Sequence, residues 1–329
     1  MSEKVKNVKE KQDIHEYVRK YALVAAFVVI CIVFAVASPT FLQLQNIVNI
    51  FRSVSINGVL AIGMTLVIII AGIDLSIGPL MAITGVVSAM ILEANPDMLV
   101  LALIAGIVAA GIMSMWTAWL VSKMNIPPFI ASLSAMSVTK GIALVISDGV
   151  PHSITNAAYM QIGNAYLWDP NATGGFSIPV MVLILVVVLA IAAVILYKTK
   201  YGRYIYAVGG NENAARASGI PIAKVKFWTY VLNGILCGIA GVMLAARTTS
   251  GQPTAGTGYE MDAITAVIVG GTSMSGGIGK LSGTIIGFFI IGVLNNGLVL
   301  MGVSSYYQTI IKGVIIAAAV VLDMKTKNK

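Results

Sequence analysis

Long apolar stretches separated by short polar segments run through almost the whole chain. A helix that crosses a bilayer needs about 20 apolar residues, within a range of about 17 to 25. Ten stretches come close to that length, at 21–37, 53–71, 76–92, 98–121, 127–146, 178–197, 227–246, 262–276, 283–301 and 304–322. The pattern predicts an all-α integral membrane protein of about ten transmembrane helices, in which residues 21–322 form one polytopic domain.

The charges of the polar segments predict how the chain is oriented. Residues 93–97 and 148–177 hold acids and no Lys or Arg, whereas 198–226 holds six Lys or Arg and a single acid. Basic loops stay on the cytoplasmic side of a membrane. Ten crossings then place the basic segment 1–20, the loop 198–226 and the Lys-rich tail 323–329 on the same, cytoplasmic side.

Composition excludes a soluble domain and changes the meaning of the net charge. Hydrophobic residues make up 58% of the chain, charged residues only 10%, and the mean hydropathy is +0.91. Soluble proteins carry about 25% charged residues. Of the 21 Lys and Arg, 15 fall in the two basic segments and the tail. The net charge of +8 therefore reflects orientation in a membrane rather than a nucleic-acid-binding surface.

The sequence offers no set of residues for enzyme chemistry. The near-membrane acids Asp74, Glu260 and Asp262 stand singly, without a neighbouring base or a nucleophile motif. The Gly-rich run 276–280 is not a phosphate loop, because Met274 stands where that motif requires Gly. The chain is expected to hydrolyse no ATP itself and to hold no metal and no cofactor.

Two Gly-rich interruptions, at 71–79 and 270–283, break the apolar pattern. They fall in two weakly related halves, formed by helices two to five and seven to ten. Because five spans separate the halves, the predicted topology inverts one half relative to the other. Paired interruptions in inverted halves indicate a transport pathway.

The polar segment 201–220 predicts a short helix on the cytoplasmic side. Asn211 is a favourable N-cap, Glu212 suits the first turn, and Gly219 ends the helix. Such a helix of about two turns, with a face of small residues, either docks into a groove of a cytoplasmic partner or is a solvated connector.

Several strings are similar to the permease subunits of ATP-binding-cassette importers. The string Glu-x-Ala-Ala-Arg-x-x-Gly-Ile at 212–220 resembles their coupling loop. Further strings resemble the ribose permease subunits, in the order of that family: Gly-Ile-Asp-Leu-Ser (72–76), Gly-Arg-Tyr-Ile-Tyr-Ala (202–207), Gln-Pro-Thr-Ala-Gly-Thr-Gly-Tyr-Glu (252–260), Asn-Asn-Gly (295–297) and Gly-Val-Ser-Ser-Tyr-Tyr-Gln (302–308).

The resemblance implies a fold and a set of partners. It implies ten helices per subunit in a permease fold like that of the vitamin B12 importer, a permease homodimer in a bacterial plasma membrane, a cytoplasmic ATPase and an extracytoplasmic sugar-binding protein. The implied substrate is a monosaccharide, D-ribose first, with xylose, galactose and autoinducer-2 as alternatives. The departures from the family pattern, at 1–20 and 148–177, bear on the partner and the substrate.

Three groups of candidate site residues follow from these patterns. The candidates for coupling to the ATPase are Gly209, Gly210, Asn211, Glu212, Ala214, Ala215, Arg216 and Gly219. The candidates for the translocation path are Asn57, Thr65, Asp74, Ser76, Asn295 and Asn296. The candidates for contact with the sugar-binding protein, in a polar outer segment, are Thr254, Thr257, Tyr259 and Glu260.

Alternatives remain open at several of these positions. Asp74 is a polar anchor at a broken-helix turn, a pathway group, or a solvated turn that caps the next helix. Asn295 and Asn296 either bond neighbouring helices or line the route, while Gly-x-x-x-Gly at 234–238 and 283–287 predicts close helix packing. The few intramembrane acids argue against an ion-coupled sugar carrier, which needs a buried titratable group. A passive channel gives no reason for the Ala-rich helix.

Overall fold

The computed structural model describes residue 21 and residues 23–167 and 178–327. The predicted basic segment 1–20, part of the predicted outer loop and the end of the tail lie outside the described residues. After a first helix at Leu23–Ala37, the elements are α2 (Leu44–Ile69), α3 (Ile77–Ala94), α4 (Leu99–Ser122), α5 (Pro128–Ile146), β1 (His152–Ser153), α6 (Ala157–Asn164), α8 (Val180–Lys198), α9 (Lys200–Gly210), α10 (Glu212–Ala217), α11 (Ile222–Thr248), β2 (Ser250–Gly251), α12 (Tyr259–Val269), α13 (Leu281–Leu300) and α14 (Ser305–Lys327).

The predicted all-α membrane class is confirmed. Within the described residues, seven helices are long and apolar enough to cross a membrane: α2, α3, α4, α5, α8, α11 and α13. Two shorter apolar helices, Leu23–Ala37 and Ser305–Val321, cover the first and the last predicted spans.

One predicted span differs in kind from the structure. The span expected at 262–276 is a helix only over Tyr259–Val269, because the chain turns at Gly270 and Gly271 has a φ of +89°. Eleven residues rise about 16 Å, roughly half of the hydrocarbon thickness. The Gly-rich sequence ends α12 there because Gly adopts the left-handed conformation without a steric cost.

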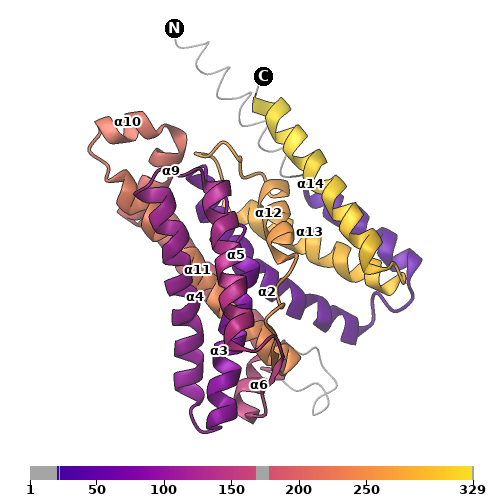
Figure 1. The fold of residues 1–329 in the computed structure, drawn as a ribbon. Helices are drawn as coiled ribbons and strands as arrows, with labels where there is room; N and C mark the ends of the chain where they lie inside the picture. The colour runs from indigo at the N-terminus through magenta and orange to yellow at the C-terminus, as the bar shows by residue number, and fades with distance from the viewer. Residues whose placement is uncertain (1–20, 22, 168–177, 328–329) are drawn as a thin grey trace.

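The centre of the molecule is α2. Every residue of α2 from Val54 to Ile69 is buried, as expected of a helix that is apolar all round. Its contacts are mainly with α11, α13, α8 and α12. Figure 1 shows α2 crossing obliquely, from the side of α14 to the side of α9.

Close helix packing surrounds this centre. A Cβ at Gly238 of α11 would lie only 2.9 Å from the Cα of Ile107 in α4, and one at Gly234 would overlap the side chain of Ser114. A Cβ at Gly287 of α13 would overlap the backbone of α12. Both predicted Gly-x-x-x-Gly packing motifs are thereby confirmed.

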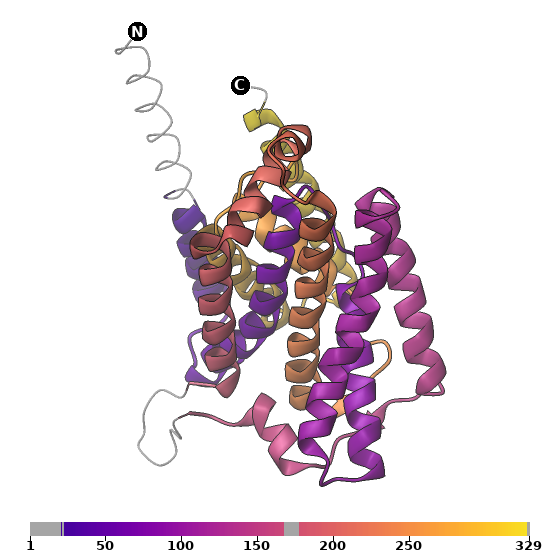
Figure 2. The ribbon, with the colours of Figure 1, turned by 90° about the vertical axis from the view of Figure 1, so that its left-hand side faces the viewer.

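The bundle has two ends, which we name the α10 end and the α6 end; they lie at the top and the bottom of Figure 1. Helix α11 runs the whole way between them, from just after α10 to its contacts with α6. Figure 2 shows the same direction for α11 from the side. Part of the predicted outer loop is therefore structured, as α6 and the two-residue strand β1, which pairs antiparallel with β2.

The chain after α11 does not stay at the α6 end. A Cβ at Gly251 would lie 2.7 Å from the Cβ of Ala89, and one at Gly256 would lie 2.6 Å from the carbonyl oxygen of Gly78. Residues 252–258 therefore return along α3 to its first turn. Helix α12 begins at that level, inside the bundle.

An amide pair connects α2 to α13. Asn46 donates to the side-chain oxygen of Asn296 at 3.0 Å, and Asn296 donates back at 2.9 Å. In membrane proteins such interhelical bonds contribute about 0.6 kcal/mol on average and about 1.7 kcal/mol at most.

Replacing either amide with Leu is expected to leave its partner unbonded and to lower the free energy of unfolding. The Asn46→Leu, Asn296→Leu and double variants, unfolded in detergent as a double-mutant cycle, should give a coupling energy of about 0.6–1.7 kcal/mol. A coupling energy of zero would show that the two amides stabilise the fold independently.

Candidate functional site

The first Gly-rich interruption buries a carboxylate. Asp74 has no solvent exposure and accepts hydrogen bonds from the backbone N–H of Ser76 at 2.9 Å and from its hydroxyl at 2.5 Å. Asn233 of α11 donates to the same carboxylate at 2.9 Å, and Tyr230 donates to the carbonyl of Ile73 at 3.2 Å. The alternative of a solvated turn at Asp74 is wrong, because α11 covers the turn and supplies its hydrogen bonds.

The second interruption meets the first. The backbone N–H of Gly277 donates to the carbonyl oxygen of Ile69, the last residue of α2, at 2.8 Å. Helix α9 joins them: a Cβ at Gly209 would overlap that same carbonyl, and Tyr206 donates to the carbonyl of Gly279 at 2.7 Å. We call this meeting of α2, α9 and the second interruption the α9 junction.

Helix α10 has the ends that the sequence predicts. The side chain of Asn211 accepts from the backbone N–H of Ala214 at 3.0 Å, which is the predicted N-cap. Gly219 has a φ of +77°, and its N–H bonds to the carbonyl of Arg216 at 3.0 Å, which is the predicted left-handed C-terminus. Ala215 faces the protein, whereas Ala214 is exposed.

Glu212 fixes α10 to the start of α11. It bonds Lys226 at 2.6 Å and Arg216, four residues further along α10, at 3.2 Å. The hydrogen bond from Lys226 is the main reason why the pKa of Glu212 lies below its usual range. The contribution of this carboxylate to stability is thus present at neutral pH and is lost as the pH falls through that lowered pKa.

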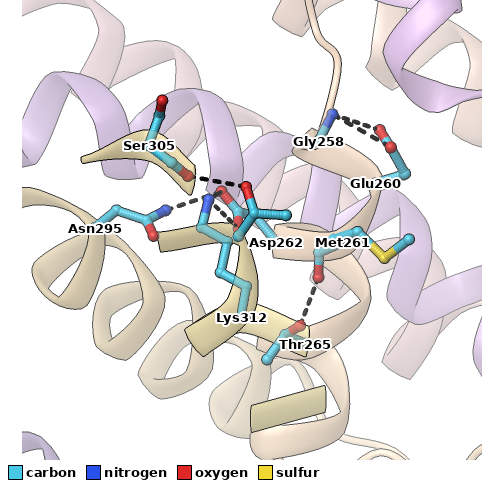
Figure 3. Close-up of polar contacts among 9 residues, drawn as sticks. Gly258, Glu260, Met261, Asp262, Thr265, Asn295, Ser305 and Lys312 are labelled. Carbon is cyan, nitrogen blue, oxygen red and sulfur yellow. Dashed lines mark hydrogen bonds and ion pairs between the residues drawn. The ribbon is translucent and has the colours of Figure 1, made fainter. Parts of the chain in front are cut away.

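An ion pair joins the two helices that follow the loop 252–258. Asp262, 6% exposed in α12, lies 2.9 Å from the ammonium of Lys312 in α14 and accepts from the amide of Asn295 in α13 at 2.8 Å. Figure 3 shows Asp262 between these two side chains. Since α14 packs mainly against α12, this pair is the principal polar attachment of α14.

A second polar group lies on the other side of the start of α12. A cavity of ≈ 30 Å³ is lined by Pro79 at the start of α3, by Met136 and Lys140 of α5, and by Pro253, Thr254, Ala255, Thr257 and Glu260. Glu260 accepts from the backbone N–H of Gly258 at 3.1 Å. The predicted outer segment is thus placed beside the start of α3 and α5.

The structure brings some of the predicted path residues together and separates others. Asp74 and Ser76 form one bonded unit, Thr65 bonds Thr284 at 2.7 Å, and Asn296 bonds Asn46. The bonds of Thr65 and Asn296 join α2 to α13, as one of the two alternatives for the asparagines requires, and Asp74 is joined to α11 by Asn233. Asn57 is buried, and its side-chain oxygen has no partner among the described residues.

Three contributors were missed by the sequence analysis: Asn233, Lys140 and Lys312. The signal for the two lysines is their isolation, since each is the single charged residue of its apolar stretch, 127–146 or 304–322. No such signal marks Asn233, because an amide in an apolar stretch does not reveal which turn it reaches.

Comparison with known proteins gives one family and a set of relatives. The family described as branched-chain amino acid transport system / permease component matches residues 46–320. The ribose import permease protein of Bacillus subtilis is 44% identical over 90% of this chain and 90% of its own, and that of Escherichia coli K12 is 44% identical over 92% and 93%. The xylose transport system permease protein of E. coli K12 is 32% identical over 94% and 92%. No solved structure matches the chain.

The α9 junction predicts opposite effects for two adjacent glycines. Gly209→Ala puts a methyl group into the carbonyl of Ile69, whereas Gly210→Ala meets nothing within 4 Å. Overpacking costs about 1–3 kcal/mol, while Gly→Ala in a helix gains about 0.5–1 kcal/mol. Thermal unfolding in detergent should show Gly209→Ala below and Gly210→Ala at or above the unchanged protein; equal melting temperatures would contradict the junction.

Proposed function

The chain belongs to the branched-chain amino acid transport system / permease component family, and we propose that it forms the membrane passage for D-ribose in an ATP-binding-cassette importer. It is a multi-pass membrane permease for sugar import and a transport subunit, not an enzyme. One observation carries the choice of sugar: the chain is 44% identical to ribose import permeases and 32% identical to a xylose permease, over a similar share of its length. Xylose is the alternative, supported by a relative of lower identity.

Such a permease requires an ATPase and a sugar-binding protein. We assign the ATPase to the α10 end, because α10 presents exposed Asn213, Ala214 and Ala217 while Ala215 and Glu212 hold it to the permease. The α9 junction connects α10 with both interrupted segments. Movement of α10 therefore reaches α2 and the loop before α13 through backbone contacts. The α10 end and both termini are then cytoplasmic, in the plasma membrane of a bacterium.

The binding protein is assigned to the α6 end. The candidates Thr254, Thr257, Tyr259 and Glu260 lie deeper than that end, along α3, so we reassign them from binding-protein contact to the passage. We further propose that the permease is a homodimer and that each copy crosses the membrane ten times. A second copy would cover the exposed side of α14, where Ser305 and Thr309 lie among apolar residues.

An ion-coupled carrier finds no support in the acids that the structure buries. Asp74 is bonded by Ser76 and Asn233, and Asp262 is paired with Lys312. Glu260, the third buried acid, accepts from the backbone N–H of Gly258. None of the three carboxylates is therefore left as a vacant site for a coupling ion.

Sugar import is expected to depend on ATP and not on an ion gradient. In proteoliposomes that hold the permease, its ATPase and its binding protein, ribose uptake should continue after ionophores remove the sodium and proton gradients. Uptake should stop when ATP is depleted. Ribose uptake that is driven by an ion gradient through the permease alone would contradict the assignment as an importer.

The coupling role of α10 predicts a loss of transport without loss of the protein. Gly219→Val places a β-branched residue at a φ of +77°, which strains the exit of the helix, and Ala215→Asp puts a charge where 4% of the residue is exposed. Both variants should remain in the membrane at normal abundance but lose binding-protein-stimulated ATP hydrolysis and uptake.

Ser218→Ala is the matched control, because Ser218 is exposed and its hydroxyl bonds only the Ala214 carbonyl of its own helix. It should transport normally. Full coupled transport by Gly219→Val and Ala215→Asp would show that α10 is only a connector.

A further inference from the structure

Lys140 lies on the exposed side of α5, at a membrane depth where a lysine is costly. It lines one cavity with Pro79, in the first turn of α3. That turn is near Asp74, which bonds Asn233, the twelfth residue of the 27-residue α11. At 1.5 Å per residue, Asn233 lies about 17 Å from the start of α11, and α11 is about 40 Å long. Lys140 thus lies near the middle of the span.

Within the described chain the carboxylate of Glu260, which lines the same cavity, attracts this ammonium but forms no ion pair with it. Lys140 is exposed, and no hydrogen bond or ion pair involves it among the described residues. A lysine that faces lipid at the centre of a helix costs about 2.5–3.5 kcal/mol on insertion scales. Lys312, the other lysine in an apolar stretch, is paired with Asp262. An ammonium without a hydrogen bond or an ion pair requires water, or a polar ligand, at this face of α5.

The groups around Lys140 are the kind that bind hydroxyls. Glu260 lines the same cavity, and the exposed Thr254 and Thr257 complete its polar side, while Pro79 and Met136 supply apolar surface. A carboxylate accepts hydrogen bonds from a polyol, an ammonium donates hydrogen bonds to it, and a hydroxyl does both. The cavity itself, at ≈ 30 Å³, is too small for a sugar, so the ligand would lie at its open side.

We propose that Lys140 and Glu260 form a hydroxyl-binding station for the monosaccharide within the passage, on the face of α5 and the loop 252–260. The station rests on the proposed function, since it names where the passage contacts its substrate. Glu260 is held in place by the N–H of Gly258. Lys140 is free to reach the sugar.

The first test asks whether Lys140 faces water, whatever is transported. In a background that lacks Cys31 and Cys237, Lys140→Cys in the assembled complex is treated with a membrane-impermeant thiosulfonate. Val138→Cys is the matched control, because Val138 is 42% exposed and lies on the opposite side of the same helix. We expect Lys140→Cys to react at least tenfold faster. Equal, slow rates would overturn the station, because Lys140 would then face lipid.

The second test separates binding in the passage from coupling. With the ATPase and the binding protein present, Lys140→Met and Glu260→Gln should lower ribose uptake at least tenfold while binding-protein-stimulated ATP hydrolysis stays within twofold. Lys140→Arg should recover part of the uptake. Lys123→Met, which removes an exposed lysine at the end of α4, should transport normally.

Two outcomes of this second test would overturn the station. Unchanged uptake by Lys140→Met would show that the ammonium does not serve the substrate. Equal loss of uptake and of ATP hydrolysis would show a structural role. If the unchanged complex imports no sugar at all, the proposed function fails, and the labelling of Lys140→Cys still reports whether this face is wet.

Discussion

A helix that breaks inside a membrane must find new partners for the backbone groups that the break sets free, because the surrounding hydrocarbon offers none. At the end of α2 the carbonyl of Ile69 is bonded by Gly277, the carbonyl of Ile73 by Tyr230, and the carboxylate of Asp74 by Ser76 and Asn233. The partners come from α11 and from the second interruption. The arrangement of α2, α3, α9 and α11 follows from satisfying this one break.

The start of α12 is stabilised differently, through a charge. Removing one partner of a buried ion pair costs about 3–5 kcal/mol, whereas an interhelical amide bond contributes about 0.6 kcal/mol on average. Removal of Lys312 is therefore expected to cost more than removal of Asn46 or Asn296, because it leaves the buried carboxylate of Asp262 without its opposite charge. Asp262 and Glu260 also lie in the first turn of α12, where the helix dipole favours negative charge. The short length of α12 puts that charged turn inside the bundle.

Local signals in the sequence were sufficient to predict where helices begin and end. They were not sufficient to predict how deep in the bundle a segment lies. The apolar stretches predict the helices, and Asn211 and Gly219 predict both ends of α10, because caps depend on neighbours within a few residues. The polar segment 252–260 resembles an outer loop by composition, yet it returns along α3. That path depends on Gly78, Gly251 and Gly256 allowing two backbones to approach, a contact between distant residues. Lys140 and Lys312 show the same limit: their isolation was visible, but only the fold tells which one is paired.

The α9 junction has a consequence for timing. Contacts between side chains yield under load, because rotamers can change before a helix moves. At Gly209 the contact is made by main-chain atoms of α9, of Ile69 and of Gly277. Main-chain atoms cannot relieve a contact by a change of rotamer. A displacement of α9 is therefore transmitted directly to Ile69 and Gly277. Helix α2 and the second interruption thus receive it together.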